Sequence, residues 1–387
     1  MTRGDKVVLA GYLVRCPLGG YAWQVLHYLV GLRALGFDPY FYEDTAYYPD
    51  CFDPLTGNMH VNPDAGVAVA ARFFQELGCG DHWGFWDAGR NRHYGLTADD
   101  TAALLDEARL VITLAAVNRL PRRRPQQRKL FIDIDPTFTQ IRIAQGDPQL
   151  VQLLGEHDLH FTIGENIGTV GCEIPIDRFT WRPTRQPIAL ELWEPLPSDP
   201  HAAVTTIGRW NEQRRDVAFR GEIYSWRKRV EWMKFLDLPR RTGERFVVAM
   251  DVDKTPGDAE TLVAHGWEIV DPIAVSRDAL SYRDFIRRSK SEFTVAKDLN
   301  VRLASGWFSD RGACYLAAGR PVVTQDTGFG RVLPTGEGLF AVRTVDEAVA
   351  AYATIGADYG RHVAAARRIA VDHFDAVSVL ADLVADA

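Results

Sequence analysis

The stretch from residue 297 to residue 340 constrains the possible folds of this chain more than any other. A loop containing glycine leads to Ser309 and Asp310, which can cap a helix over 311–318. The apolar run at 321–324 then predicts a buried strand, and a second glycine-containing loop follows it. A glycine loop before a helix leaves backbone N–H groups unpaired at the positive end of the helix dipole. This stretch therefore predicts an anion-binding site.

The first part of the chain shows a similar alternation of strand, loop and helix. An apolar run at 6–14 predicts a buried strand, Gly19 and Gly20 form the loop, and apolar residues recur at helical spacing over 21–35. A second strand is predicted at 37–42. Further buried strands are predicted at 109–117, 129–134, 159–163, 203–208, 246–250, 267–270 and 291–296. Such alternation predicts an α/β fold with doubly wound, Rossmann-like sheets.

The length of the chain favours two domains. A chain of 387 residues is too long for one ordinary domain and suits two, each with its own core. Prolines cluster between residues 172 and 200, where a stiff and extended segment can join two domains. We expect Rossmann-like domains at 1–195 and 196–350, followed by C-terminal helices at 351–387.

Composition argues against several classes of protein. The formal net charge is -7, so nucleic acid is not an expected partner. We expect no transmembrane segment and a cytoplasmic location, because no apolar run is long enough to span a bilayer and the start of the chain lacks signal-peptide features. The five cysteines are scattered along the chain, which argues against a disulfide framework and against structural zinc.

Three motifs give the chain a family resemblance. They are residues 17–20 (P-L-G-G), the Gly-Arg pair at 208–209, and the stretch 305–338 with its A-x-G-x-P-V-V pattern. Together they resemble GT-B fold glycosyltransferases. Residues 164–168 and 305–311 are also similar to family-1-type bacterial glycosyltransferases of unassigned acceptor. The resemblance implies two Rossmann-like domains that face a cleft, with the acceptor on the first, the nucleotide sugar on the second, and the C-terminal helices crossing back to the first.

The resemblance also implies where the donor binds. In that fold the start of the helix after residue 308 receives the diphosphate, and the loop after the strand at 321–324 meets the sugar. Arg209 and Lys297 are expected to neutralise phosphate charge. The implied donor-binding residues are Gly19, Gly20, Arg209, Lys297, Ser305, Gly306, Phe308, Ser309, Asp310, Arg311, Asp326, Thr327, Gly328 and Phe329. The alternatives are that Asp310 is only an N-cap, that the glycines only form turns, and that Lys297 lies on a rim without a partner.

The chain departs from the retaining enzymes that it most resembles. Those enzymes carry E-G-F-G before the helix and a second glutamate on it. The corresponding positions fall near Gly306 and Cys314. The glutamate pair is missing, so its ribose-binding and catalytic roles cannot be carried over. Retention or inversion at the anomeric centre stays open.

Acidic residues follow several of the predicted strands. The carboxyl ends of parallel strands line a crevice in such folds, and an inverting transfer needs a general base there. Asp135 and Glu165 are the preferred candidates, with Asp133 and Glu43 behind them. Each of them has an alternative interpretation as a turn or loop-capping residue.

No cofactor and no metal ion are expected. Neither G-x-G-x-x-G nor G-x-x-x-x-G-K-[ST] is present, so the sequence does not indicate a dinucleotide or P-loop site. A helix dipole and cationic side chains can take the place of a divalent ion at a diphosphate. Asp251 and Asp253 form a literal D-x-D, so a metal site there is the rival interpretation.

Two segments keep two interpretations each. The aromatic-rich segment at 51–96 is either a loop that recognises a sugar or aglycone, or a surface packing loop. The basic run at 119–124 is either a solvated loop or a docking patch for an anionic acceptor or a membrane surface.

The sequence favours a glycosyltransferase that moves a sugar from a UDP-, GDP- or dTDP-sugar to a small-molecule or natural-product acceptor. One alternative is a sugar-nucleotide epimerase of the same fold. The other is a non-catalytic partner protein that binds the nucleotide sugar and never turns it over.

Overall fold

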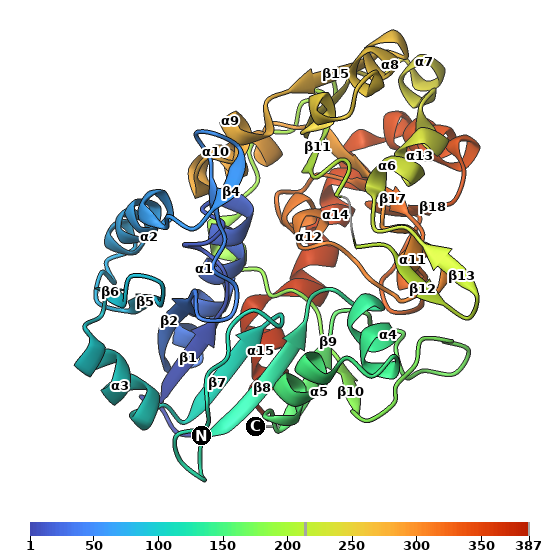
Figure 1. Ribbon diagram of the computed structural model, residues 1–387. Coiled ribbons are helices and arrows are strands. Elements are labelled where there is room, and N and C mark those ends of the chain that lie inside the picture. Colours follow the sequence, from blue (N-terminus) through green and yellow to red (C-terminus); the bar gives the residue numbers. More distant parts are fainter. Residues whose placement is uncertain (213–214, 386–387) are drawn as a thin grey trace.

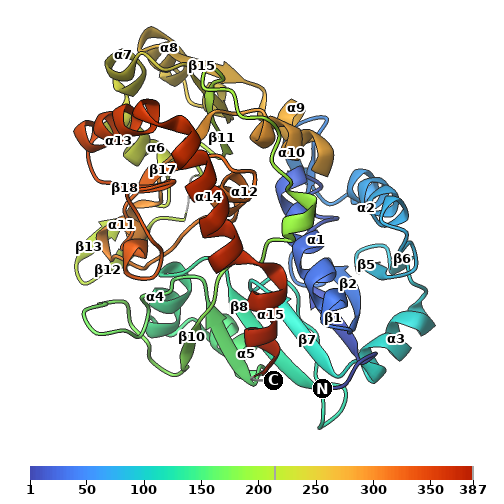
Figure 2. The same ribbon diagram turned by 180° about the vertical axis from the view of Figure 1, so that it is seen from behind.

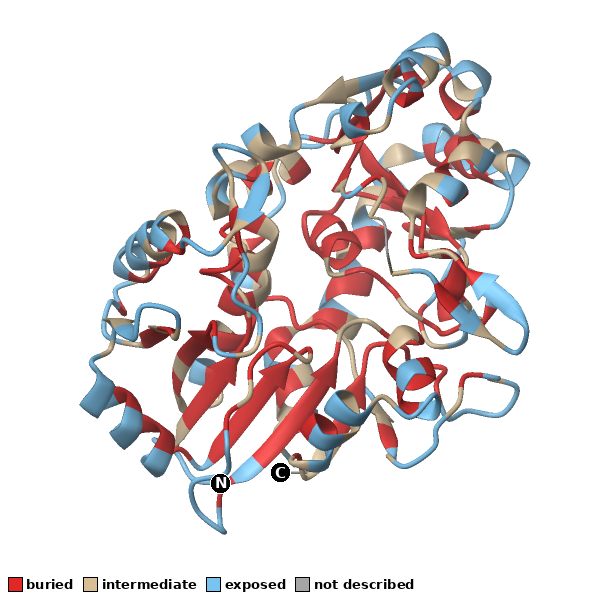
Figure 3. Cartoon of the chain, in the orientation of Figure 1, coloured by how far each residue is buried: buried red, intermediate tan, exposed pale blue. Residues whose placement is uncertain are grey.

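Two sheets of mainly parallel strands organise the chain, with helices packed around each (Figure 1). The computed structural model describes residues 1–212 and 215–385. The central strands of both sheets are buried (Figure 3), because they are short apolar runs with few polar side chains to leave in water. The predicted α/β class with two doubly wound sheets is confirmed.

The first sheet has the strand order β10-β9-β8-β7-β1-β2-β5-β6, and its pairs are parallel except for β5 with β6. Its strands are β1 (Lys6–Ala10), β2 (Asp38–Asp44), β5 (Trp83–Asp87), β6 (Arg92–Gly95), β7 (Leu110–Leu114), β8 (Arg128–Asp133), β9 (Leu159–Thr162) and β10 (Trp181–Pro183). The helices of this half are α1 (Gly19–Ala34), α2 (Asp64–Glu76), α3 (Ala98–Glu107), α4 (Phe138–Ala144) and α5 (Pro148–Gly155). The chain leaves β1 between its neighbours β2 and β7 and enters α1 there, so α1 begins at the switch point of the sheet.

The second sheet has the order β15-β14-β11-β16-β17-β18, and all its pairs are parallel. Its strands are β11 (Val204–Gly208), β14 (Phe246–Met250), β15 (Trp267–Val270), β16 (Ser291–Thr294), β17 (Val322–Gln325) and β18 (Leu339–Val342). Its helices are α6 (Lys228–Trp232), α7 (Leu238–Thr242), α8 (Asp258–Ala264), α9 (Pro272–Ser276), α10 (Ala279–Arg287), α11 (Asp298–Arg302), α12 (Asp310–Ala317) and α13 (Val345–Ala357). Here the switch point lies between β11 and β16.

Two antiparallel hairpins and four short 3₁₀ turns complete the secondary structure of the described residues. The hairpins are β3 (Cys51–Asp53) with β4 (Asn58–His60), and β12 (Val217–Phe219) with β13 (Glu222–Tyr224). The 3₁₀ turns are η1 (Leu190–Leu192), η2 (Met233–Phe235), η3 (Val252–Lys254) and η4 (Phe329–Arg331).

The C-terminal helices return to the first half of the chain (Figure 2). Helix α14 (Tyr359–Phe374) packs along α12, and α15 (Ala376–Ala385) packs against α1. The contact with α1 is close, because a Cβ at Gly31 would lie 2.6 Å from Leu380 Cδ1. Ala376 N also donates a hydrogen bond to Ile188 O over 2.9 Å. The last two residues of the segment predicted at 351–387 lie outside the described part of the chain.

Several elements of the structure were not expected from the sequence. The hairpin β12–β13 was not expected, and α6 begins at Lys228, shortly after β13 ends at Tyr224. Strands β5 and β6 were not expected in the aromatic-rich segment, yet β5 pairs with β2 and extends the first sheet. Among the helices of the described residues, none combines the length and apolar character needed to cross a membrane.

Candidate active-site cleft

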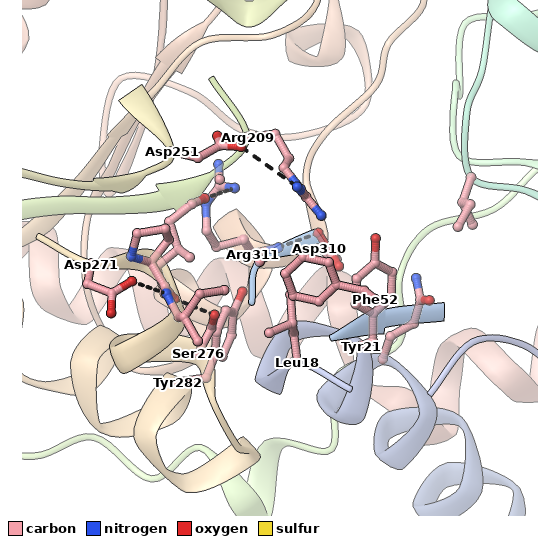
Figure 4. Close-up of a pocket in the computed structure, with 18 of the residues that line it drawn as sticks. Leu18, Tyr21, Phe52, Arg209, Asp251, Asp271, Ser276, Tyr282, Asp310 and Arg311 are labelled. Atoms are coloured by element: carbon pink, nitrogen blue, oxygen red, sulfur yellow. Dashed lines mark hydrogen bonds and ion pairs between the residues drawn. The ribbon is translucent and has the colours of Figure 1, made fainter. Parts of the chain in front are cut away.

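A cavity of 420 Å³ lies between the two halves of the chain (Figure 4). The second half contributes residues at the carboxyl ends of three strands: Gly208 ends β11, Asp251 follows β14, and Asp271 follows β15. The first half contributes the start of α1, with Gly20, and the hairpin β3–β4, with Phe52. This is the edge at which doubly wound sheets bind their ligands.

Two cations of the second half meet the hairpin β3–β4 at the cavity. The Arg209 guanidinium lies 5.2 Å from the centre of the Phe52 ring, and its Nη1 is 3.7 Å from Asp251 Oδ2. Lys254 Nζ donates to Gly57 O over 3.1 Å. Arg209 keeps 44% of its side chain exposed, so it remains open to a ligand. Of the donor-binding residues implied by the sequence, Gly20, Arg209, Asp310 and Arg311 line this cavity.

Three carboxylates that line the cavity are already bound by backbone N–H groups. Asp251 Oδ1 accepts from Trp210 N over 2.9 Å, and Asp271 Oδ1 accepts from Ile273 N over 2.8 Å. Asp310 Oδ1 accepts from Arg311 N, also over 2.8 Å. These hydrogen bonds offset part of each negative charge, which lowers the repulsion that an anionic ligand meets here.

The start of α12 is capped by its own side chains. Ser309 Oγ accepts from Gly312 N over 2.8 Å, and Asp310 holds the N–H of Arg311. We expected unpaired N–H groups at this helix start, and these two N–H groups are occupied. Ser309 is the N-cap and Asp310 is the first residue of α12, so an anion here has to share the helix start with the Asp310 carboxylate.

Arg311 is held inside the second half. Its Nε donates to Glu292, its Nη1 donates to Ile207 O, and its Nη2 donates to Thr294 Oγ1 over 2.8 Å. Burial opposes the charge, but the Glu292 carboxylate raises the pKa of Arg311 above its ordinary value. The guanidinium fixes β11 and β16 together, and Arg311 also lines the cavity.

Several other predicted donor residues form the junction between the halves. Asn166 N donates to Ser305 O over 3.0 Å, and Asn166 Nδ2 donates to Ala304 O and Gly328 O over 2.9 and 3.0 Å. Gly306 has φ +78°, and a Cβ there would lie 2.7 Å from Asn166 N. These residues bring the chain segments together and do not line the cavity.

The remaining residues of the two loops have structural contacts as well. Thr327 Oγ1 donates to Trp307 O over 2.6 Å. The rings of Phe308 and Phe329 are buried with their centres 5.4 Å apart. Asp326 forms an ion pair with Arg343 over 2.7 Å. These four residues do not line the cavity, whereas Trp307 of the first loop does.

Gly19 does not line the cavity and lies against the second half. A Cβ at this position would collide with Asp278 O and would lie 2.5 Å from Tyr282 Cβ. Glycine is therefore needed so that the start of α1 can approach α10 of the second half.

The preferred catalytic carboxylates lie in different places. Asp135 follows Ile134, which lines the cavity, and its two oxygens pair with Lys297 Nζ and Arg215 Nη2, each over 3.4 Å. Glu165 pairs with Arg185 over 2.5 Å and lines a separate cavity of 640 Å³ beside α15. Glu165 is therefore not brought together with Asp135.

The two reserve carboxylates are structural. Glu43 is fully buried and accepts from the N–H groups of residues 13, 14 and 15 and from Arg15 Nε. Asp133 accepts from Thr139, Gln140 and Thr162, and its burial raises its pKa to about 6. Both side chains hold loops at strand ends, which matches the loop-capping interpretation.

Two lysines do not line the cavity but contact residues in or next to its lining: Lys228 contacts Trp307, and Lys297 contacts Asp135, which follows Ile134. Lys297 Nζ is 3.0 Å from the centre of the Trp226 ring, and burial lowers its pKa. Lys228 was missed by the sequence analysis. Its Nζ is 5.6 Å from the centre of the ring of Trp307, and burial, with Arg311 and Lys297 nearby, lowers its pKa to about 7. An anion bound near these two amines would raise the pKa of both and so favour their protonated forms.

The hairpin residues Phe52 and Gly57 were also missed as members of the site, although the aromatic-rich segment had been considered for sugar recognition. Asp271 carried a usable signal, because it directly follows a predicted strand.

No group of three or more His, Cys, Asp or Glu side chains in the described residues is placed to hold a metal ion.

The comparisons with known proteins agree with this architecture. No protein-family model matches the chain, and no curated protein matches it in sequence. The chain is similar to the structure of an alpha-glucosyltransferase in complex with UDP and a 13-mer DNA containing a central A:G mismatch, at 12% identity and a TM-score of 0.60 over 99% of both chains. It is also similar to sucrose-phosphate synthase from Thermosynechococcus elongatus, at 11% identity and a TM-score of 0.54 over 99% and 98% of the two chains.

A third similar structure is that of Anabaena HepE in complex with UDP, at 10% identity and a TM-score of 0.54 over 99% and 100% of the two chains. Identities this low establish the fold and leave the substrate open. The chain therefore has the fold of the GT-B glycosyltransferases.

Proposed function

We propose that this protein is a glycosyltransferase that uses a nucleotide-diphosphate sugar. The observation that carries the proposal is the 420 Å³ cavity at the carboxyl ends of β11, β14 and β15, which faces the start of α1 across the cleft. Structures of the same fold with UDP bound support it, since UDP is named for the alpha-glucosyltransferase and for HepE.

In the proposed complex, cationic side chains stabilise the diphosphate. Arg209 lines the cavity, and Lys228 and Lys297 lie beside it. Arginine is suited to bidentate phosphate contacts, and the two lysines add positive charge where a departing diphosphate needs it. We propose that this set acts without a divalent ion. Asp251, the first acid of the D-x-D, is engaged with Trp210 N and Arg209, which supports that choice.

The nucleoside end of the donor is proposed to lie at the ends of β14 and β15. Asp253, Ile273 and Ser276 line the cavity there and combine polar groups with an apolar surface. The sugar then points toward the first half, where Gly20 and Ile134 line the same cavity. A small-molecule acceptor remains our proposal, and the formal net charge of -7 supports it over nucleic acid.

Asp135 is the carboxylate that we propose as the general base for an inverting reaction. It directly follows Ile134 at the cavity, and it is the acid of the first half that contacts Lys297. Glu165 is not proposed for this role, because its carboxylate pairs with Arg185 in another cavity.

A thermal-shift panel tests the proposal directly. UDP, GDP and dTDP and their sugar conjugates are added to the full chain, and the ligand that binds the folded state raises the melting temperature. We expect one nucleotide to do so, and we expect Arg209→Ala and Lys297→Ala to reduce its effect. A melting temperature that does not change with any of the three nucleotides or their sugar conjugates would contradict the proposal.

Product analysis separates the two other functions considered from the sequence. Incubation of the wild-type chain with the donor and no acceptor should leave the donor intact on the time scale of transfer. Conversion of the donor to an isomer would instead identify an epimerase, and binding without turnover against a broad acceptor panel would identify a binding partner.

A further inference from the structure

The hairpin β3–β4 brings one aromatic side chain of the first half to the charged wall of the cavity. Phe52 is 4% exposed and lies with its ring centre 5.2 Å from the Arg209 guanidinium. Gly57, at the turn of the same hairpin, accepts from Lys254 Nζ over 3.1 Å. Both hairpin residues line the cavity together with both cations. The first half therefore contacts the cationic side chains of the second half directly.

The hairpin has a firm base. Phe52 N donates to Arg15 O over 2.7 Å, and Arg15 is itself fixed by Glu43 at 0% exposure. The turn is closed locally, because Gly57 N donates to Asp53 O over 2.8 Å. The position of the Phe52 ring is thus set by the buried network of the first half and not by Arg209 itself.

An aromatic ring suits the task of holding a phosphate-binding arginine. A carboxylate partner accepts hydrogen bonds from the N–H donors of the guanidinium. An aromatic ring instead attracts the positive charge through a cation–π interaction, which leaves the N–H groups free for phosphate oxygens. Asp251 reaches one edge of Arg209 at 3.7 Å, and 44% of the side chain stays exposed. The ring contacts the guanidinium while the remaining N–H donors stay available.

We propose that Phe52 is a positioning residue for donor binding, which acts by orienting Arg209 toward the diphosphate. The inference rests on the proposed function and adds to it, since it assigns part of the diphosphate site to the half of the chain that faces the acceptor. It also gives the aromatic hairpin a role in the donor site.

A double-mutant cycle with Arg209 tests this. Dissociation constants of the wild type, Phe52→Leu, Arg209→Ala and the double variant are measured by calorimetry with whichever of UDP, GDP and dTDP binds most tightly. Phe52→Leu keeps an apolar side chain of similar volume and should weaken nucleotide binding about three- to five-fold, which corresponds to the loss of one cation–π contact. In the Arg209→Ala background it should have no further effect. Phe52→Tyr keeps the ring and should retain wild-type affinity.

The outcomes separate the two levels of the argument. Failure of the wild type to bind any of the three nucleotides overturns the proposed function and this inference with it. Nucleotide binding that Phe52→Leu leaves unchanged, or lowers equally with and without Arg209, overturns the inference alone. Melting temperatures of the ligand-free variants report folding, and a variant that does not fold is replaced by Phe52→Met, to which the same expectations apply.

Discussion

Arg311 and Glu292 form a buried ion pair that links the start of α12 to β16. The pair makes Arg311, which was expected at the donor site, a structural residue of the second half as well as a residue of the cavity lining. Its guanidinium also bonds Ile207 O at the end of β11, so three elements around the switch point depend on one side chain.

Arg311→Ala should therefore destabilise the protein strongly. Removal of one partner leaves the Glu292 carboxylate buried and uncompensated, which costs about 3–5 kcal/mol. Urea denaturation of the ligand-free chain measures the loss. Arg343→Ala is the matched control, because Arg343 also pairs with a carboxylate, that of Asp326, but is 76% exposed, and it should change stability much less. Equal effects of the two substitutions would contradict the structural role of Arg311.

Arg209→Ala should weaken nucleotide binding without loss of stability. Hydrogen bonds to charged groups contribute about 1.5–3 kcal/mol, so the dissociation constant should rise at least about ten-fold. Calorimetry with the best nucleotide of the panel measures it. Arg245→Ala serves as the control, because Arg245 pairs with Glu268 away from the cavity. An unchanged dissociation constant for Arg209→Ala would refute the diphosphate assignment.

Nucleotide affinity should depend on pH through Lys228. Burial lowers its pKa to about 7 in the empty cleft, and a bound diphosphate raises that pKa because it favours the charged amine. Below pH 7 the amine is protonated in both the free and the bound protein, so its contribution to affinity is complete. Above pH 7 the free protein loses the proton and binding has to restore it, so affinity falls by up to about ten-fold per pH unit.

Calorimetry between pH 7 and pH 9 tests this dependence, with proton uptake read from buffers of different ionisation enthalpy. Lys228→Met should abolish both the slope and the proton uptake. A slope that persists unchanged in Lys228→Met would assign the titration to another group.

Asp135→Asn should lower kcat by about 100-fold or more, because a general base contributes on that scale. The substitution keeps the volume and one hydrogen-bond acceptor for Lys297 and Arg215, so the KM for the donor should change less than kcat. Steady-state kinetics with a competent acceptor provide both values. A change confined to KM would show that Asp135 acts only by holding Lys297.

Sugar transfer should survive removal of divalent ions. In the proposed complex, cationic side chains neutralise the diphosphate in place of a metal ion. Asp251 is engaged in contacts within the chain, which supports this proposal. Activity is measured after exhaustive treatment with a chelator, then with added manganese. Loss of activity with the chelator and recovery with manganese would reject the metal-free account.

Local patterns predicted the strands of the second half well. β14 and β15 have the predicted bounds, because each is a short run of large apolar residues flanked by polar ones. The hairpin β12–β13 was missed because its stability comes from cross-strand pairs such as Val217 with Tyr224, which no local periodicity reports. Strand β5 was missed for the same reason, since it depends on pairing with β2.

Residues of the candidate site that directly follow a strand could be predicted from the sequence. Residues that reach the site through contacts between the two halves could not. Arg209 was found from its place after β11. Phe52 and Lys228 were missed, because their importance arises from contacts between residues far apart in the chain. The glycine at residue 306 signals a backbone constraint in the sequence. The structure shows that Asn166 leaves no room for a Cβ at this position.

The close approach of Gly19 to Asp278 and Tyr282 limits how the cleft can change its width. Backbone of the first half already touches the second half there, with no side chain left to compress. Translation of one half toward the other is blocked at that place. Narrowing of the cleft around a donor therefore requires a rotation whose axis passes near Gly19. A methyl group at residue 19 would push the two halves apart and limit this rotation.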